Sequence, residues 1–149
     1  MYNNHINITN FNFKIKKYYD LEQIESSMLD MPQIDCKLDH IFGDNVYIRQ
    51  VTMPADAIVM GHEHTGDSIN VMLKGKMLFL DEDGQVQELN APWAGVKPPM
   101  RKMAVILEDV VWQNIYYTKE TDLEKLESTY IKKSQSFIAK ENNLWLGSL

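Results

Sequence analysis

The sequence predicts an all-β, antiparallel protein, either a sandwich or a barrel, with a short helix before the sheet and a helix after it. From residue 45 onward, seven short segments are rich in β-branched and aromatic residues or alternate with a period of two. Turn residues such as Pro54, Gly75 and Gly84 separate these segments, and the connections are too short for the helical crossovers of parallel strands. A chain of 149 residues has room for one core.

The first 44 residues predict a polar arm, one strand and one helix. Residues 1–12 are rich in Asn and indicate an arm, and residues 13–19 alternate like a strand. A helix is expected over residues 20–29, because Asp20 and Gln23 have the spacing of a capping pair and the apolar residues that follow share one helical face.

The sheet itself is expected over residues 45–118. We expect a strand in each of the segments 45–53, 58–64, 68–74, 76–81, 85–89, 102–107 and 110–118. The turn chemistry predicts a bend at Gly75, a hairpin loop over residues 81–84, an extended edge segment over residues 91–99 and a tight turn at Glu108 and Asp109.

Residues 119–149 are expected to form a C-terminal helix and an apolar tail within the same domain. Thr121 and Glu124 have the spacing of a capping box, which predicts a helix over residues 122–141 with a break near residues 134–136. The tail contains Trp145, whose exposure to water is unfavourable. We therefore expect the tail to dock on the sheet or on a second subunit, and the protein to be a homo-oligomer, a dimer or higher.

Composition excludes several classes of partner. The net charge of -6 argues against nucleic-acid binding through a general positive field. Cys36 is the single cysteine, so no internal disulfide can form, which favours a reducing compartment. The first residues lack the apolar region of a secretory signal, and no segment approaches the ~18 apolar residues that span a bilayer. We expect a cytoplasmic protein that binds neither nucleic acid nor a membrane.

Two histidines at alternate positions are the main candidates for chemistry. Residues two apart on a strand point to the same side, so His62 and His64 are expected to project together while Glu63 points away. Two neighbouring imidazoles can supply ligands to one divalent metal ion, such as Zn, Mn, Fe or Ni. The alternative is a pair of polar side chains at the mouth of the sheet.

The histidine segment resembles the first motif of the cupin superfamily, a family of small jelly-roll β-barrels. The resemblance is carried by the pair His62 and His64, by the short bend and apolar strand that follow, and by Gly75, which lies eleven residues after His64. It implies a cupin-like barrel in which the two histidines are metal ligands.

Further features extend the resemblance to roughly residues 45–118. The hairpin at Asp83 and Gly84 and the proline-bounded segment 91–99 lie where a cupin has them. The closing strand from Leu107 to Trp112 is similar to that of small cupin-like proteins often encoded by bacteriophages.

Two ligand positions of the family are changed in this chain. Ser68 occupies the position of the family's glutamate, and residues 98–103 contain no histidine where the second motif supplies one. Asp67 is the nearest carboxylate, and it joins the histidines only if a bend at Thr65 and Gly66 resets the alternation. The expected metal ligands are therefore His62 and His64, with Asp67 as the candidate third.

Basic and aromatic residues point instead to a pocket for a polar or anionic molecule. Whichever of Arg101 and Lys102 faces inward brings a positive charge, which disfavours a metal ion and favours a carboxylate or phosphate; the alternative is an exposed loop. Trp112, Asn114 and Tyr116 share one face and form a stacking wall if that face is inward; the alternative is a core role. The candidate ligand-binding residues are His62, His64, Ser68, Arg101, Lys102, Trp112 and Tyr116.

Three functions are compatible with these residues. The favoured one is a barrel that binds a small polar or anionic ligand, with a degenerate metal site and little or no catalysis; by analogy, it could sequester a small molecule as a phage accessory protein. The resemblance implies a second, a metal-dependent isomerase, lyase or oxygenase that uses His62 and His64. The third is a structural or oligomeric interaction protein, because fold alone does not fix function.

Overall fold

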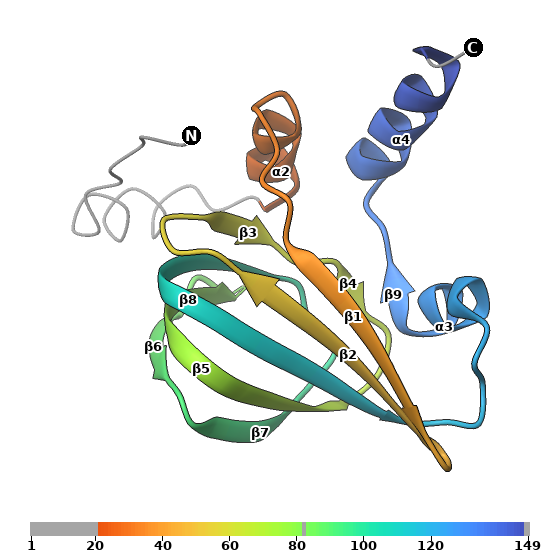
Figure 1. Cartoon of the computed structure of the whole chain (residues 1–149). Helices are drawn as coiled ribbons and strands as arrows, with labels where there is room; N and C mark the ends of the chain where they lie inside the picture. The colour runs from red at the N-terminus through yellow and green to blue at the C-terminus, as the bar shows by residue number, and fades with distance from the viewer. Residues whose placement is uncertain (1–20, 82, 148–149) are drawn as a thin grey trace.

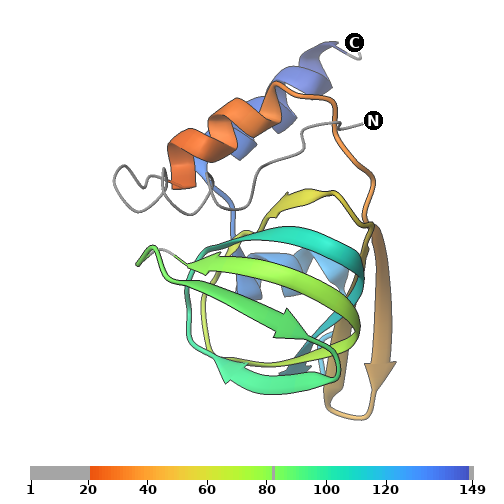
Figure 2. The same ribbon diagram turned by 90° about the vertical axis from the view of Figure 1, so that its left-hand side faces the viewer.

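The computed structural model describes residues 21–81 and 83–147, and its centre is a curved antiparallel sheet of seven strands in the order β1-β2-β8-β5-β6, with β3 beside β8 and β7 beside β5 (Figure 1). The strands are β1 (Lys37–Gly43), β2 (Val46–Met53), β3 (Ile58–Met60), β5 (Ser68–Asp81), β6 (Val86–Asn90), β7 (Trp93–Lys97) and β8 (Lys102–Tyr117). The sheet curls into a barrel (Figure 2), which confirms the prediction of an antiparallel all-β fold.

The long strands β5 and β8 pair along almost their whole length and form the backbone of the barrel. Two predictions are therefore wrong: residues 68–74 and 76–81 belong to one strand, and Glu108 and Asp109 lie inside β8 rather than in a turn. The ladder instead shifts register opposite this point, next to Gly75, which has a φ of 96°. A Cβ at Gly75 would clash with the Asp109 carbonyl oxygen, so a glycine bulge provides the bend that the sequence predicts.

Strand β1 pairs with β2 and forms one edge of the sheet, although the sequence predicts no strand there. The adjacent apolar residues Ile41 and Phe42 break the period of two, and both are partly exposed. Asn45, with a φ of 59°, makes the turn into β2. The strand predicted over residues 13–19 lies outside the described residues.

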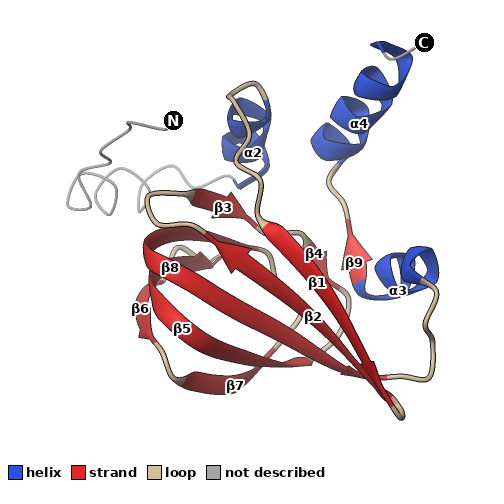
Figure 3. Ribbon diagram, viewed as in Figure 1, coloured by secondary structure: helices blue, strands red, loops and turns tan. Residues whose placement is uncertain are grey.

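Three helices flank the barrel (Figure 3): α2 (Leu21–Leu29), α3 (Leu123–Tyr130) and α4 (Gln135–Gly147). The N-terminal helix is confirmed, and the C-terminal helix predicted over residues 122–141 is broken, but at residues 131–134 rather than near residues 134–136. Strand β9 (Ile131–Lys132) interrupts it and pairs with β4 (Glu63–His64). Asp122, rather than Thr121, caps α3 by accepting a hydrogen bond from the Lys125 N–H. The Trp145 side chain, for which docking is predicted, lies outside the described side chains.

Helices α2 and α4 lie at the same end of the barrel and contact each other (Figure 2). Leu21 of α2 is buried against Leu80 and Met103, which anchors this helix to the barrel. Among the described helices none is long and apolar enough to cross a membrane.

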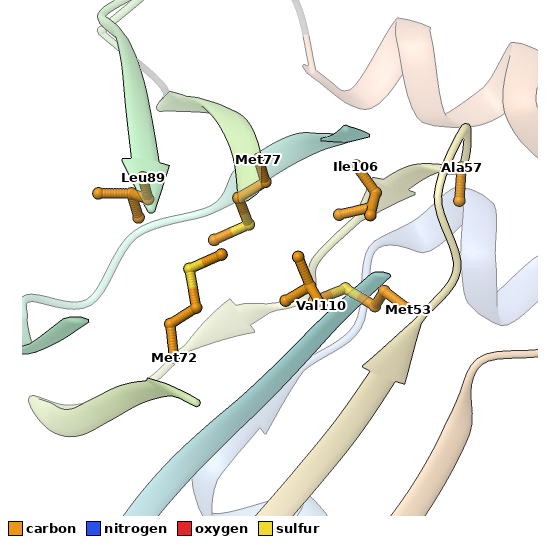
Figure 4. Close-up of a cluster of buried hydrophobic side chains, with 7 residues drawn as sticks. All are labelled: Met53, Ala57, Met72, Met77, Leu89, Ile106 and Val110. Carbon is orange, nitrogen blue, oxygen red and sulfur yellow. The ribbon is translucent and has the colours of Figure 1, made fainter. Parts of the chain in front are cut away.

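The main core fills one part of the barrel interior (Figure 4). It consists of Met53, Ala57, Met72, Met77, Leu89, Ile106 and Val110. Three of these residues are methionines, whose flexible side chains fill irregular core space. The remaining interior is not filled, and it forms the cavity described next.

Candidate functional site

A cavity of about 280 Å³ lies inside the barrel beside the core. This volume is nearly twice that of an engineered cavity of about 150 Å³ that accommodates benzene. The polar and charged side chains of its wall are Arg49, His62, His64, Ser68, Asn70, Lys102 and Asn114. Its apolar wall includes Val51, Met53, Val59, Met77, Ala104 and Trp112. The cavity therefore joins one polar region to a larger apolar surface.

Both histidines line the cavity, although the strand that carries them is interrupted. Strand β3 pairs with β8 as far as Met60, and the Gly61 N–H adds one more hydrogen bond, to the Lys102 carbonyl. The chain then separates from β8 and forms β4, which pairs with β9. Glu63 instead pairs with Lys132 at the surface. The predicted orientation of His62 and His64 therefore agrees with the structure, while the continuous strand over residues 58–64 does not.

A hydrogen bond to a residue outside this cavity orients the His64 ring. Its Nδ1 lies 2.9 Å from the hydroxyl of Tyr116. Burial, followed by the positive charges of Arg49 and Lys102 and by His62, lowers the pKa of His64 to about 4. The imidazole is therefore neutral at pH 7, and one of its two nitrogens carries a proton.

His62 lies against helix α4. Its ring meets the ring of Phe137 edge to face, with 4.6 Å between centroids. Burial lowers the pKa of His62, although the carboxylate of Glu25 opposes this shift. Its Nδ1 is buried without a hydrogen-bond partner among the described residues.

Three buried polar residues form a network on the inner face of β5 and β8. Asn70 donates to the carbonyl oxygen and to the hydroxyl of Ser68, at 3.0 and 3.1 Å, and Asn114 donates to the side-chain oxygen of Asn70. Their exposed fractions are only 2% to 6%. Such a network fixes the direction of each amide before any ligand arrives.

Arg49 is the functional candidate that reasoning from the sequence missed. It lies on β2 directly opposite Asn114 and lines the cavity. No ion pair within the described part of the chain involves Arg49. The alternation of β2 could have identified it, because Arg49 shares a face with Val51 and Met53, which also line the cavity.

Of the two predicted basic residues, only Lys102 lines the cavity, where its ammonium lies 5.4 Å from the centroid of the Phe79 ring. Arg101 instead pairs with the buried Glu25 of α2, and its Nε donates to the Gly61 carbonyl at 3.2 Å. The prediction that Arg101 faces the ligand pocket is therefore corrected: it joins the barrel to α2.

The predicted aromatic wall is present in part. Trp112 lines the cavity and stacks on Trp93, with 5.6 Å between ring centroids. Tyr116 points the same way but lines a second cavity of about 190 Å³ under α3, together with Tyr47 and Tyr130. It therefore contacts the first cavity only through His64, and its predicted direct contact with a ligand is corrected.

The third metal ligand that the sequence predicts is absent from the site. Asp67 is exposed and does not line the cavity, so the bend at Thr65 and Gly66 does not turn it inward. Among the described residues, no group of three metal-binding side chains comes together. Since catalytic metal sites commonly have three protein ligands, and Arg49 lies near His64, these residues do not fit a divalent ion well.

Known proteins resemble this chain in structure but not in sequence. No protein-family profile matches the chain, and no curated protein matches its sequence. Several solved structures do match the chain. The chain is similar to cupins. A cupin superfamily protein from Desulfitobacterium hafniense is 16% identical, with 63% of this chain and 87% of that one covered and a TM-score of 0.48.

Two further structures are similar to a comparable degree. An RmlC-like cupin from Methanocaldococcus jannaschii, with a double-stranded β-helix fold, is 11% identical, with 60% of this chain and 85% of that one covered and a TM-score of 0.48. A protein from Neisseria meningitidis is 14% identical, with 68% of this chain and all of that one (100%) covered and a TM-score of 0.49.

Proposed function

We propose that the protein binds a small organic anion inside its barrel. One observation carries this proposal: Arg49, which makes no ion pair within the described part of the chain, lines the cavity, and no carboxylate of the described residues lines it. The chain as a whole is acidic, with a net charge of -6, so this local excess of positive charge runs against its overall composition. Arg49 is partly buried, so an anion that neutralises it offsets part of the cost of removing its charge from water.

The polar groups around Arg49 suit the same ligand. A guanidinium can donate two parallel hydrogen bonds to a carboxylate, and Asn114, directly opposite Arg49, uses one of its two amide N–H groups for Asn70. A neutral His64 supplies one further N–H. Binding would therefore replace water around the anion with fixed donors.

The experiment compares hexanoate with 1-hexanol, which has the same chain without the charge. We expect calorimetry on the full chain to show tighter binding of hexanoate, and Arg49→Gln to weaken it at least tenfold, as expected for a lost charged hydrogen bond. The matched control is Lys119→Gln, which removes an exposed charge outside the cavity. Equal affinity for the alcohol, together with no effect of Arg49→Gln, would overturn the proposal.

A metal-dependent enzyme is the second candidate, because His62 and His64 line one cavity. Metal analysis of the tag-free protein tests it: near-stoichiometric metal that is lost in the His62→Ala/His64→Ala variant would favour this candidate over the anion binder. The cytoplasmic location, the phage-type role and the homo-oligomer remain predictions from the sequence.

A further inference from the structure

The register of the sheet separates a polar end of the cavity from an apolar end. Arg49, Asn114 and Asn70 lie directly opposite one another on β2, β8 and β5 and form one inward row. The next inward row consists of Val51, Trp112 and Met72, and the row after it begins with Met53 and Val110. The inward side chains therefore change from polar to apolar between one row and the next, two residues further along each strand.

The apolar end continues into the core of the protein. Val51, Val59, Ala104 and Trp112 are only partly buried and pack against the core cluster of Figure 4, while also lining the cavity. An apolar group placed here would contact side chains that already contact the core. Each methylene moved from water to such a surface contributes roughly 0.8 kcal/mol.

A bare inorganic anion does not match this arrangement. A small ion held by Arg49 at the polar end would leave the apolar wall of the cavity of about 280 Å³, which includes Val51 and Trp112, without a contact. Only Arg49 lies in the polar row, so one negative charge suffices there.

We propose that the ligand is an amphiphilic monocarboxylate, with its carboxylate at the row of Arg49, Asn114 and Asn70 and its apolar body against Val51, Trp112 and Ala104. This inference rests on the proposed function, since it names the class of anion bound in the same cavity. The size of the cavity favours a body as large as one ring or a short alkyl chain.

The test measures affinity along straight-chain carboxylates from acetate to octanoate, and along the matching alcohols, by calorimetry on the full chain. We expect each added methylene to tighten carboxylate binding about fourfold until the cavity is full. The variant Ala104→Leu fills the apolar end, so the gain should stop at a shorter chain than in the wild type. Ala55→Leu, in an exposed turn, is the control and should behave like the wild type.

The outcomes separate the two claims. If carboxylates are preferred over alcohols and Arg49→Gln weakens them, but affinity is flat with chain length, the amphiphilic class is wrong and the anion site stands. If affinity rises equally for acids and alcohols and Arg49→Gln has no effect, the anion site is wrong. If no member of either series binds, both are wrong. The wild-type series gives these answers even if Ala104→Leu does not fold.

Discussion

The hydroxyl of Tyr116 lies 2.9 Å from Nδ1 of His64 and connects the two cavities of the protein. Among the described residues, His64 is the hydrogen-bond partner of this hydroxyl. Burial raises the pKa of Tyr116 to about 12, so the hydroxyl keeps its proton at pH 7. If it accepted from Nδ1 instead, its own buried O–H would lack a described partner, so we expect it to donate to Nδ1, with the proton of the neutral imidazole on Nε2.

The first prediction concerns this hydrogen bond. Tyr116→Phe should lower the free energy of unfolding by about 1–3 kcal/mol, because it leaves a buried acceptor unsatisfied. The ¹⁵N chemical shifts of His64 should also change from one tautomer to a mixture. Urea unfolding and NMR measure the two effects. The control Tyr117→Phe alters a side chain that is 84% exposed and should have little effect. An unchanged His64 spectrum in Tyr116→Phe would contradict the assignment.

The second prediction concerns acid sensitivity. The pKa of His64 is about 4 in the folded protein against 6.5 in an ordinary histidine. Between these two values only the unfolded chain binds the proton. The free energy of unfolding therefore does not depend on His64 above pH 6.5, and it decreases as the pH falls from 6.5 to about 4. The loss amounts to roughly 3 kcal/mol.

Urea unfolding from pH 7.5 to pH 4.5 checks this loss. Carboxylates also titrate in this range, so the measurement compares wild type with His64→Gln. The variant should lose less stability on acidification, whatever its stability at pH 7.5. Parallel curves for the two proteins would show that His64 is not the source.

The third prediction concerns the ion pair between Glu25 and Arg101, which joins α2 to the barrel. Both side chains are nearly buried, and Ser134, before α4, also donates to Glu25. Glu25→Ala should lower the free energy of unfolding by about 3–5 kcal/mol, because it removes the buried carboxylate that pairs with the nearly buried Arg101. The exposed Glu124→Ala is the control, with an effect under about 0.5 kcal/mol.

A double variant keeps this prediction testable. Glu25→Leu/Arg101→Met replaces the pair by apolar side chains, and it should be more stable than Glu25→Ala, since no buried charge remains. Chemical unfolding measures all of these proteins. A double variant that is less stable than Glu25→Ala would mean that packing, rather than charge, holds α2 in place.

Most strands could be predicted because one side of each faces water, which imposes the period of two. Glu108 and Asp109 suggested a turn because two acidic residues follow an apolar run. Here they lie at a bulge, where β8 bends opposite Gly75, and the partner strand that continues across the bend is not visible in the local sequence. Strand β1 was missed because Ile41 and Phe42 are adjacent and the alternation fails.

The parts of the site that depend on spacing within one segment could be predicted. The parts that depend on contacts between residues far apart in the sequence could not. The spacing of His62 and His64 was enough to place both rings in the cavity. The role of Arg101 was wrong because its partner, Glu25, lies in a helix far away in the sequence. Arg49 was missed because its place in the cavity depends on the pairing of β2 with β8, which sets Arg49 opposite Asn114.

The last prediction concerns self-association, which the sequence predicts and which the outer face of the sheet can support. Ile41, Ile48, Ile115, Ile69 and Val96 lie directly opposite one another across five strands. Their inward neighbours line the two cavities, so this row faces outward. Ile41, Ile69 and Val96 are 44%, 52% and 66% exposed. A continuous apolar row on an outer face is typical of an interface, and a second copy can cover it symmetrically.

Sedimentation velocity checks this expectation. We expect the wild type to sediment as a dimer or higher at tens of micromolar, and Ile69→Lys/Val96→Lys to sediment as a smaller species, because two buried lysines in an apolar interface are unfavourable. Met31→Lys changes another exposed apolar residue away from the sheet and should leave the oligomer intact. A monomeric wild type would show that the prediction is wrong. An oligomer that survives the double variant would place the interface elsewhere, and deletion of residues 142–149 would then test the tail.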